Sequence, residues 1–89
     1  MTFETTLTDR GIGEYRIDFG SVEDRNEWYD ECLYRKKAFG DIFSVTKGMH
    51  IIYGDKDYDY STSLFIVCTH KEMTRINAIL DDYYKNEEA

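Results

Sequence analysis

The sequence predicts one α+β domain over residues 1–89, with the order ββαβββα and a mixed or antiparallel five-stranded sheet that carries two helices on one face. Two observations support this fold class. The five consecutive apolar residues 64–68 leave no polar face, which is typical of a central strand covered on both sides. Segments 21–39 and 70–86 have helical patterns and are separated by short strand-like segments. A chain of this length forms a single domain.

The first two strands are expected at residues 3–7 and 14–19, where apolar and polar residues alternate. The connection between them contains Gly11 and Gly13 and is typical of a turn, so the two strands are expected to pair as a hairpin. Gly20 ends the second strand.

The first helix is expected to begin after Ser21, which stands three residues before Asp24 as in a capping box, and to end before Gly40. Trp28 is expected at one edge of the inward face. That face would consist of Val22, Tyr29, Cys32, Leu33 and Phe39. The first half is acidic and the end is basic, the polarity that the helix dipole favours, so stability alone offers one explanation for the acids. They are Glu23, Asp24, Glu27, Asp30 and Glu31.

The second half of the chain predicts three more strands and a helix. The strands are expected at residues 41–47, 49–53 and 61–68. Residues 54–60 form a polar connection or a long, twisted hairpin tip. Thr69 and Glu72 form a capping box for the last helix, and residues 86–89 form a short acidic tail. The apolar stripe of this helix is Met73, Ile76, Ile79, Leu80 and Tyr83.

The formal net charge of −7 argues against binding through phosphate neutralisation, because the field has the wrong sign for nucleic acids and anionic membranes. A basic protein partner is favoured instead. No signal peptide and no apolar run of about 18 residues is present, so we expect a cytoplasmic protein that does not bind membranes. Cys32 and Cys68 occupy apolar positions and are expected to be buried thiols.

No pattern typical of an enzyme is present, and no catalytic residue, cofactor or metal is expected. Asp55, Asp57 and Asp59 have the spacing of the first ligands of a calcium loop. The rest of that loop is missing, because Tyr60 replaces its glycine and Ile66 its closing glutamate. A small enzyme would require a histidine or cysteine with a perturbed titration.

Negative charge gathers at the end of the last helix, where acidic side chains oppose the helix dipole. These acids are Asp81, Asp82, Glu87 and Glu88. The strand 61–68 spans about 26 Å and the helix 70–86 returns about 25 Å, so an antiparallel pair would bring this helix end to residues 55–59. Seven carboxylates would then line one edge. Tyr58, Tyr60, Tyr83 and Tyr84 would lie beside them.

Rows of carboxylates can substitute for nucleic-acid phosphates in the basic groove of a DNA- or RNA-binding protein. Phosphates follow one another at about 3.4 Å along a DNA strand, and helix positions such as Glu23, Glu27 and Glu31 lie about 6 Å apart. In size, acidity and tyrosine content the chain resembles the small phage-encoded DNA mimics of the anti-restriction type. The resemblance implies an inhibitor of a host nuclease or DNA-binding protein in the host cytoplasm, and homodimers are common among such mimics.

Under this hypothesis the partner-binding residues are Asp55, Asp57, Asp59, Asp81, Asp82, Glu87, Glu88, Glu23, Glu27, Asp30, Glu31, Tyr58, Tyr60 and Tyr84. An acidic edge that only aids solubility is the structural alternative. The other functional hypothesis is a generic interaction or assembly subunit that binds through exposed aromatic residues. Its anchors would be Trp28, Tyr34, Tyr58 and Tyr60. A phosphate-mimic complex weakens steeply as salt rises, whereas an aromatic interface does not.

Overall fold

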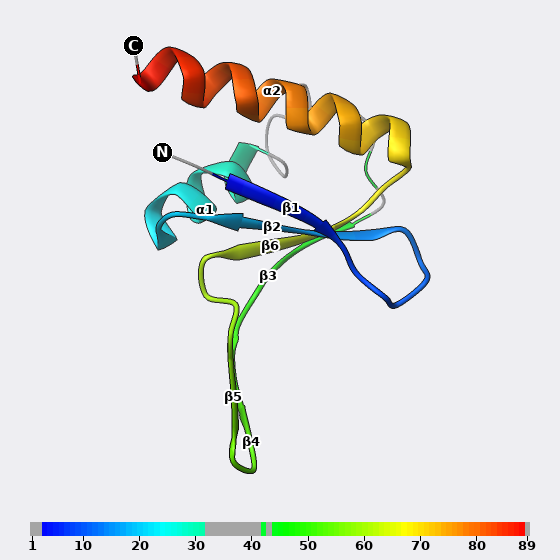
Figure 1. Cartoon of the computed structure of the whole chain (residues 1–89), viewed down its shortest axis with the longest axis vertical. Coiled ribbons are helices and arrows are strands. Elements are labelled where there is room, and N and C mark those ends of the chain that lie inside the picture. The colour runs from blue at the N-terminus through cyan, green and yellow to red at the C-terminus, as the bar shows by residue number, and fades with distance from the viewer. Residues whose placement is uncertain (1–2, 32–41, 43, 89) are drawn as a thin grey trace.

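The computed structural model describes residues 3–31, 42 and 44–88, and for residues 86–88 it describes the backbone alone. These residues form two helices and six strands (Figure 1). The strands are β1 (Phe3–Leu7), β2 (Glu14–Phe19), β3 (Ser44–Lys47), β4 (His50–Tyr53), β5 (Lys56–Asp59) and β6 (Ser63–Val67), and the helices are α1 (Val22–Asp30) and α2 (His70–Glu88). Two helices combined with antiparallel sheets confirm the predicted α+β class.

Strand β6 lies at the centre of a four-stranded antiparallel sheet with the order β1-β2-β6-β3. It pairs with β2 on one side, where Leu64 faces Ile17, and with β3 on the other side, where Ile66 faces Val45. The apolar run that predicted a central strand therefore does form one. The predicted hairpin of the first two strands is also present, since β1 pairs antiparallel with β2.

Side chains alternate along each strand and give the four-stranded sheet a covered face and an open face. Leu64 and Ile66 point to the covered face and are completely buried, whereas Phe65 and Val67 point to the open face and are half-buried. The prediction that this strand is covered on both sides therefore holds in full for one face and in part for the other. Figure 1 shows both helices on the same side of the sheet.

The core fills the space between the covered face and the two helices. Its buried members are Tyr15, Ile17, Phe19, Trp28, Leu64, Ile66, Cys68, Met73, Ile76, Leu80 and Tyr84. The last turns of α2 present Tyr84 to this core, whereas Tyr83 is 38 % exposed, so the inward stripe ends one residue later than predicted. A hydrogen bond of 2.7 Å from Thr5 Oγ1 to Asn77 Oδ1 links β1 to α2.

Helix α1 begins as predicted, since the Asp24 backbone N–H donates to Ser21 Oγ at 3.1 Å. Its inward face differs from the prediction. Trp28 is buried and its Nε1 donates to Tyr84 Oη at 3.0 Å, so it lies in the core and not at an edge, whereas Val22 is exposed. The predicted continuation to residue 39, with Cys32, Leu33 and Phe39, lies outside the described residues.

Helix α2 begins at the predicted cap, where the Glu72 backbone N–H donates to Thr69 Oγ1 at 3.2 Å. The helix continues to Glu88, so it includes residues 86–88 of the predicted acidic tail. Within the described part of the chain, neither helix combines the length and the hydrophobicity needed to cross a membrane.

The predicted single sheet of five strands was wrong, because β4 and β5 form a separate two-stranded sheet. Residues 56–59, expected in a connection or a hairpin tip, form a strand that pairs with β4. This hairpin leaves the four-stranded sheet and projects away from both helices (Figure 1). The chain consequently measures 41 Å along its longest axis, although it has a small core.

We expect the Leu80→Ala substitution to lower the free energy of unfolding by about 2–5 kcal/mol, because it leaves a cavity at a completely buried position of α2. Asp82→Ala, at an exposed position of the same helix, should change it by no more than about 0.5 kcal/mol. Urea denaturation followed by circular dichroism measures both values. Equal effects of the two substitutions would contradict the assigned core.

Candidate functional site

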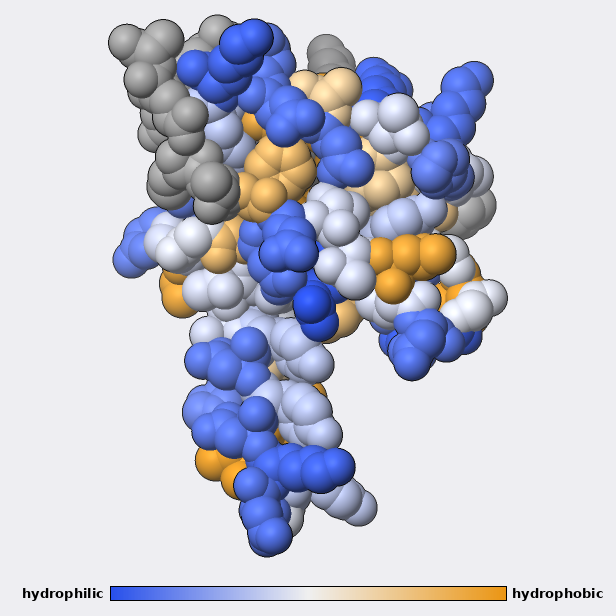
Figure 2. Space-filling view, in the orientation of Figure 1, coloured by the Kyte–Doolittle hydropathy of each residue, from blue (hydrophilic) through white to orange (hydrophobic). Residues whose placement is uncertain are grey.

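The strongest candidate for a functional site is the hairpin of residues 50–59, which we call the arm. It consists of β4, β5 and a two-residue turn, Gly54 and Asp55. Gly54 has a φ of +64°, the left-handed region that tight hairpin turns require. Every side chain of both strands is exposed, including Ile52 at 71 % and Tyr53 at 79 %. Figure 2 shows hydrophobic surface on the arm among hydrophilic side chains.

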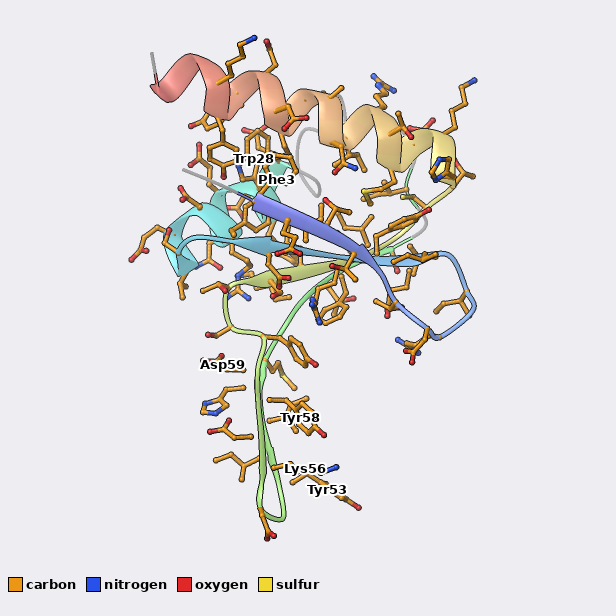
Figure 3. All side chains as sticks on the ribbon, viewed as in Figure 1. Phe3, Trp28, Tyr53, Lys56, Tyr58 and Asp59 are labelled. Atoms are coloured by element: carbon orange, nitrogen blue, oxygen red, sulfur yellow. The ribbon has the colours of Figure 1, made fainter. Side chains whose placement is uncertain are left out.

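The two faces of the arm differ in chemistry. The register of the hairpin sets Ile51 opposite Tyr58 and Ile52 opposite Asp57. One face, which we call the aromatic face, therefore carries Ile51, Tyr53, Lys56 and Tyr58. The other, the acidic face, carries His50, Ile52, Asp57 and Asp59. Tyr53, Lys56 and Tyr58 point to one side of the arm and Asp59 to the other (Figure 3).

Both carboxylates of the acidic face have local hydrogen-bond partners. Asp59 Oδ1 accepts a hydrogen bond of 3.0 Å from the Ser61 backbone N–H, and bonding by Ser61 holds the pKa of Asp59 below its usual value. Asp57 contacts the His50 ring. Asp55 lies exposed at the turn. At neutral pH the arm thus presents three aspartates against one lysine.

Aromatic packing anchors the base of the arm on the open face of the sheet. Tyr58 and Tyr60 stack with their ring centroids 6.4 Å apart, and Tyr60 meets Phe65 of β6 edge to face at 5.5 Å. The Arg16 guanidinium lies 5.4 Å from the centroid of the Tyr60 ring. The aromatic face is therefore continuous with the central strand through Tyr60.

The direction of the arm is set by a close backbone contact at Gly48, between β3 and β4. A Cβ atom at this position would lie 2.2 Å from the carbonyl oxygen of Tyr60, a distance that no side chain tolerates. The buried Arg25 of α1 donates to the carbonyl oxygens of Gly48 at 3.1 Å and Ser63 at 3.3 Å. Arg25 positions the bend, and no pattern in the sequence singled it out, because an arginine is rarely buried.

A shallow hollow of about 490 Å³ lies on the open face beside the base of the arm. Leu7, Arg10, Arg16, Tyr60 and Phe65 contribute to its lining. Arg10 donates to Glu14 at 2.9 Å, so the guanidinium charge there is largely compensated. The hollow therefore offers apolar and aromatic surface, without a strong positive or negative electrostatic field.

The predicted edge of seven carboxylates was wrong for the five whose side chains the structure describes. Asp81 and Asp82 are exposed on α2, which covers one face of the sheet, whereas the arm with Asp55, Asp57 and Asp59 projects from the other side (Figure 1). The prediction placed residues 55–59 next to the start of the strand 61–68, where the helix returns, but the bend at Gly48 and Tyr60 turns the arm away. The side chains of Glu87 and Glu88 lie outside the described residues.

The remaining predicted residues divide between surface and core. Glu23, Glu27 and Asp30 are exposed on α1, and Glu31 is half-buried. Tyr58 is exposed, and Tyr60 is half-buried at the base of the arm. Tyr84 and Trp28, predicted as binding residues under one hypothesis or the other, are buried in the core, so neither is available to a partner. Tyr34 lies outside the described residues.

The described residues include no group of three or more His, Cys, Asp or Glu side chains placed to hold a metal ion. Burial, with a smaller contribution from the nearby Glu72 carboxylate, raises the pKa of the Cys68 thiol to about 11. A nucleophilic cysteine needs the opposite shift, because the thiolate is the reactive form. Cys68 is therefore a core residue, as predicted, whereas Cys32 lies outside the described residues.

We expect Gly48→Ala to lower the free energy of unfolding by about 1–3 kcal/mol, since the new methyl group would overlap the Tyr60 backbone. Amide chemical shifts should change most at Tyr60 and Arg25. Gly11→Ala is the control. The new Cβ atom at position 11 would meet no atom within 4 Å, so the only strain there comes from the positive φ of the backbone. Unchanged shifts at Tyr60 in Gly48→Ala would contradict this account of the bend.

We expect Cys68 to resist alkylation by iodoacetamide at pH 8 in the folded protein, because it is buried and its pKa is raised to about 11. In urea the same residue should react at the rate of a free thiol. Peptide mass spectrometry distinguishes Cys68 from Cys32. Rapid modification of Cys68 in the folded protein would reopen a nucleophilic role.

Comparison with known proteins finds no relative whose site could be set beside this one. No protein-family model, no curated protein and no solved structure matches the chain. The arm, the bend that directs it and the exposed acids of α1 are therefore assigned from the residues of this chain alone.

Proposed function

We propose that this chain is a binding protein that docks through its arm on a protein partner with a basic surface. One observation carries the proposal: every side chain of β4 and β5 is exposed, and four of the eight residues are Ile51, Ile52, Tyr53 and Tyr58. Three of these residues, Ile51, Tyr53 and Tyr58, share the aromatic face, and exposed apolar patches of this kind mark interaction sites in soluble proteins.

The arm makes no contribution to the core that could explain its composition. The buried residues lie between the sheet and the helices, and none of them belongs to β4 or β5. An isolated two-stranded hairpin is marginally stable in water, and contact with another molecule would bury its exposed apolar residues. Tyrosine is among the residues that most often dominate binding energy, which favours Tyr53 and Tyr58 as anchors.

The chemistry of the expected partner follows from charge. The whole chain carries a net charge of −7, and the arm itself carries Asp55, Asp57 and Asp59 against Lys56. A field of this sign attracts and orients a basic partner before contact forms. We infer a partner that combines basic residues with an apolar cleft for the tyrosines, and the cytoplasm as the compartment in which the two meet.

Nucleic-acid mimicry is the second candidate function, and the exposed acids of α1 favour it. Glu23, Glu27 and Asp30 are exposed at helical spacing of four and three residues, so they follow one side of α1 about 5–6 Å apart. The partner would then be a host nuclease or another DNA-binding protein. The acids of α1 and the acids of the arm form two separate groups. Mimicry therefore requires a partner whose nucleic-acid-binding groove contacts each group independently.

A lysate capture followed by titration tests the proposal. The immobilised protein is incubated with bacterial lysate, the retained protein is identified by mass spectrometry, and its affinity for variants is measured at low and high salt. The Tyr53→Ala/Tyr58→Ala variant should weaken binding by at least about 30-fold, the effect of losing a binding hot spot.

The matched control is Glu23→Gln/Glu27→Gln, which leaves the arm intact and should change the affinity less than about twofold. If the control variant weakens binding more than the tyrosine variant, and affinity falls steeply with salt, nucleic-acid mimicry replaces docking through the arm. Equal binding by all three proteins would contradict both candidates.

A further inference from the structure

We propose that the free edge of β4 pairs antiparallel with β4 of a second copy of this chain. The two arms would then form one sheet with the order β5-β4-β4-β5. Among the described residues, β4 pairs only with β5 and β5 only with β4, so each strand has one unpaired edge. The inference goes beyond the proposed function, because it concerns self-association and does not depend on another partner.

The hairpin register shows which backbone groups point outward from β4. Tyr53 and Lys56 flank a two-residue turn and therefore form a hydrogen-bonded pair, and alternation makes Ile51 and Tyr58 the next such pair. The Tyr60 backbone N–H, which donates to the Met49 carbonyl at 3.0 Å, continues the same alternation. The N–H and C=O groups of His50 and Ile52 consequently point to the free edge of β4.

The two edges of the arm differ in charge, and this difference favours β4 over β5 as the strand that pairs with a second copy. Strand β5 has the sequence Lys-Asp-Tyr-Asp, and charged residues on an edge strand oppose pairing with another chain. A twofold pairing of β5 with itself would set aspartates directly opposite each other, Asp57 against either Asp57 or Asp59. Strand β4 has the sequence His-Ile-Ile-Tyr, which carries no charge when the histidine is neutral.

In one register of the β4 pair, the backbone groups of both outward residues, His50 and Ile52, form hydrogen bonds and the turn takes no part. This register is centred on Ile51, which faces Ile51 of the second copy. His50 of each copy then faces Ile52 of the other, and each such pair exchanges both backbone hydrogen bonds. Met49, which is 65 % exposed, faces Tyr53. No cross-strand pair in this register joins two like charges, and β-branched and aromatic residues favour such pairs.

The contact is small, because it involves one short strand from each copy, and interfaces below about 1,200 Å² are usually weak. We therefore expect reversible association in the micromolar range or weaker. Both copies carry a net charge of −7, so added salt screens their repulsion and should strengthen the pair. Binding to a basic partner should respond to salt in the opposite direction, which separates the two associations experimentally.

Sedimentation equilibrium over a concentration series tests the proposal with two matched variants. Ile52→Pro removes an outward N–H of β4, and Asp57→Pro removes the outward N–H of its cross-strand partner on β5. Neither variant loses a backbone hydrogen bond within the hairpin, whereas Asp57→Pro also removes the contact of Asp57 with the His50 ring. Ile52→Pro should raise the dissociation constant of the dimer at least tenfold, whereas Asp57→Pro should leave it within about threefold.

A second pair of variants, which changes side chains without introducing proline, keeps the test valid if a proline variant fails to fold. Ile51→Lys sets two lysines opposite each other in the dimer and should abolish it, whereas Tyr58→Lys adds the same charge on β5 and should not. In the unmodified protein, exchange of the His50 and Ile52 amides should slow as concentration rises. A protein that stays monomeric at millimolar concentration, or a dimer that responds equally to both members of either variant pair, would overturn the proposal.

Discussion

Leu64 and Ile66 of β6 are completely buried in the same core as Ile76 and Leu80 of α2, and the other elements are arranged around this contact. The chain has only 89 residues, so these few side chains provide a large part of the apolar surface removed from water. Strands β2 and β3 pair with β6 on either side, and α1 is attached to the same core by Trp28. The sheet is thereby left with one open face, from which the arm departs.

Local patterns predicted the parts of the fold that depend on neighbours in sequence. The apolar run of β6, the caps at Ser21 and Thr69, and the stripe through Met73, Ile76 and Leu80 each correspond to an element in the structure. In each of these cases one short segment contains enough information, because its own hydrogen bonds or its periodicity decide the conformation.

The features that sequence reasoning missed depend on contacts between distant residues. Ile51 and Ile52 have the composition of a core strand, and only the bend between Gly48 and Tyr60 places them outside the core. The same bend separates the acids of the arm from those of α2. The inward position of Trp28 depends on Tyr84, a residue 56 positions later in the chain.

The arm joins the body through two short connections, and none of its strand residues belongs to the core. Selection can therefore act on residues 50–59 almost independently of selection for folding, because substitutions there leave the buried side chains untouched. Related chains would be expected to conserve Gly48, Tyr60 and Arg25, which direct the arm, while its two faces diverge with each new partner. Under the proposed function, the arm is in this respect an evolvable recognition element carried by a constant scaffold.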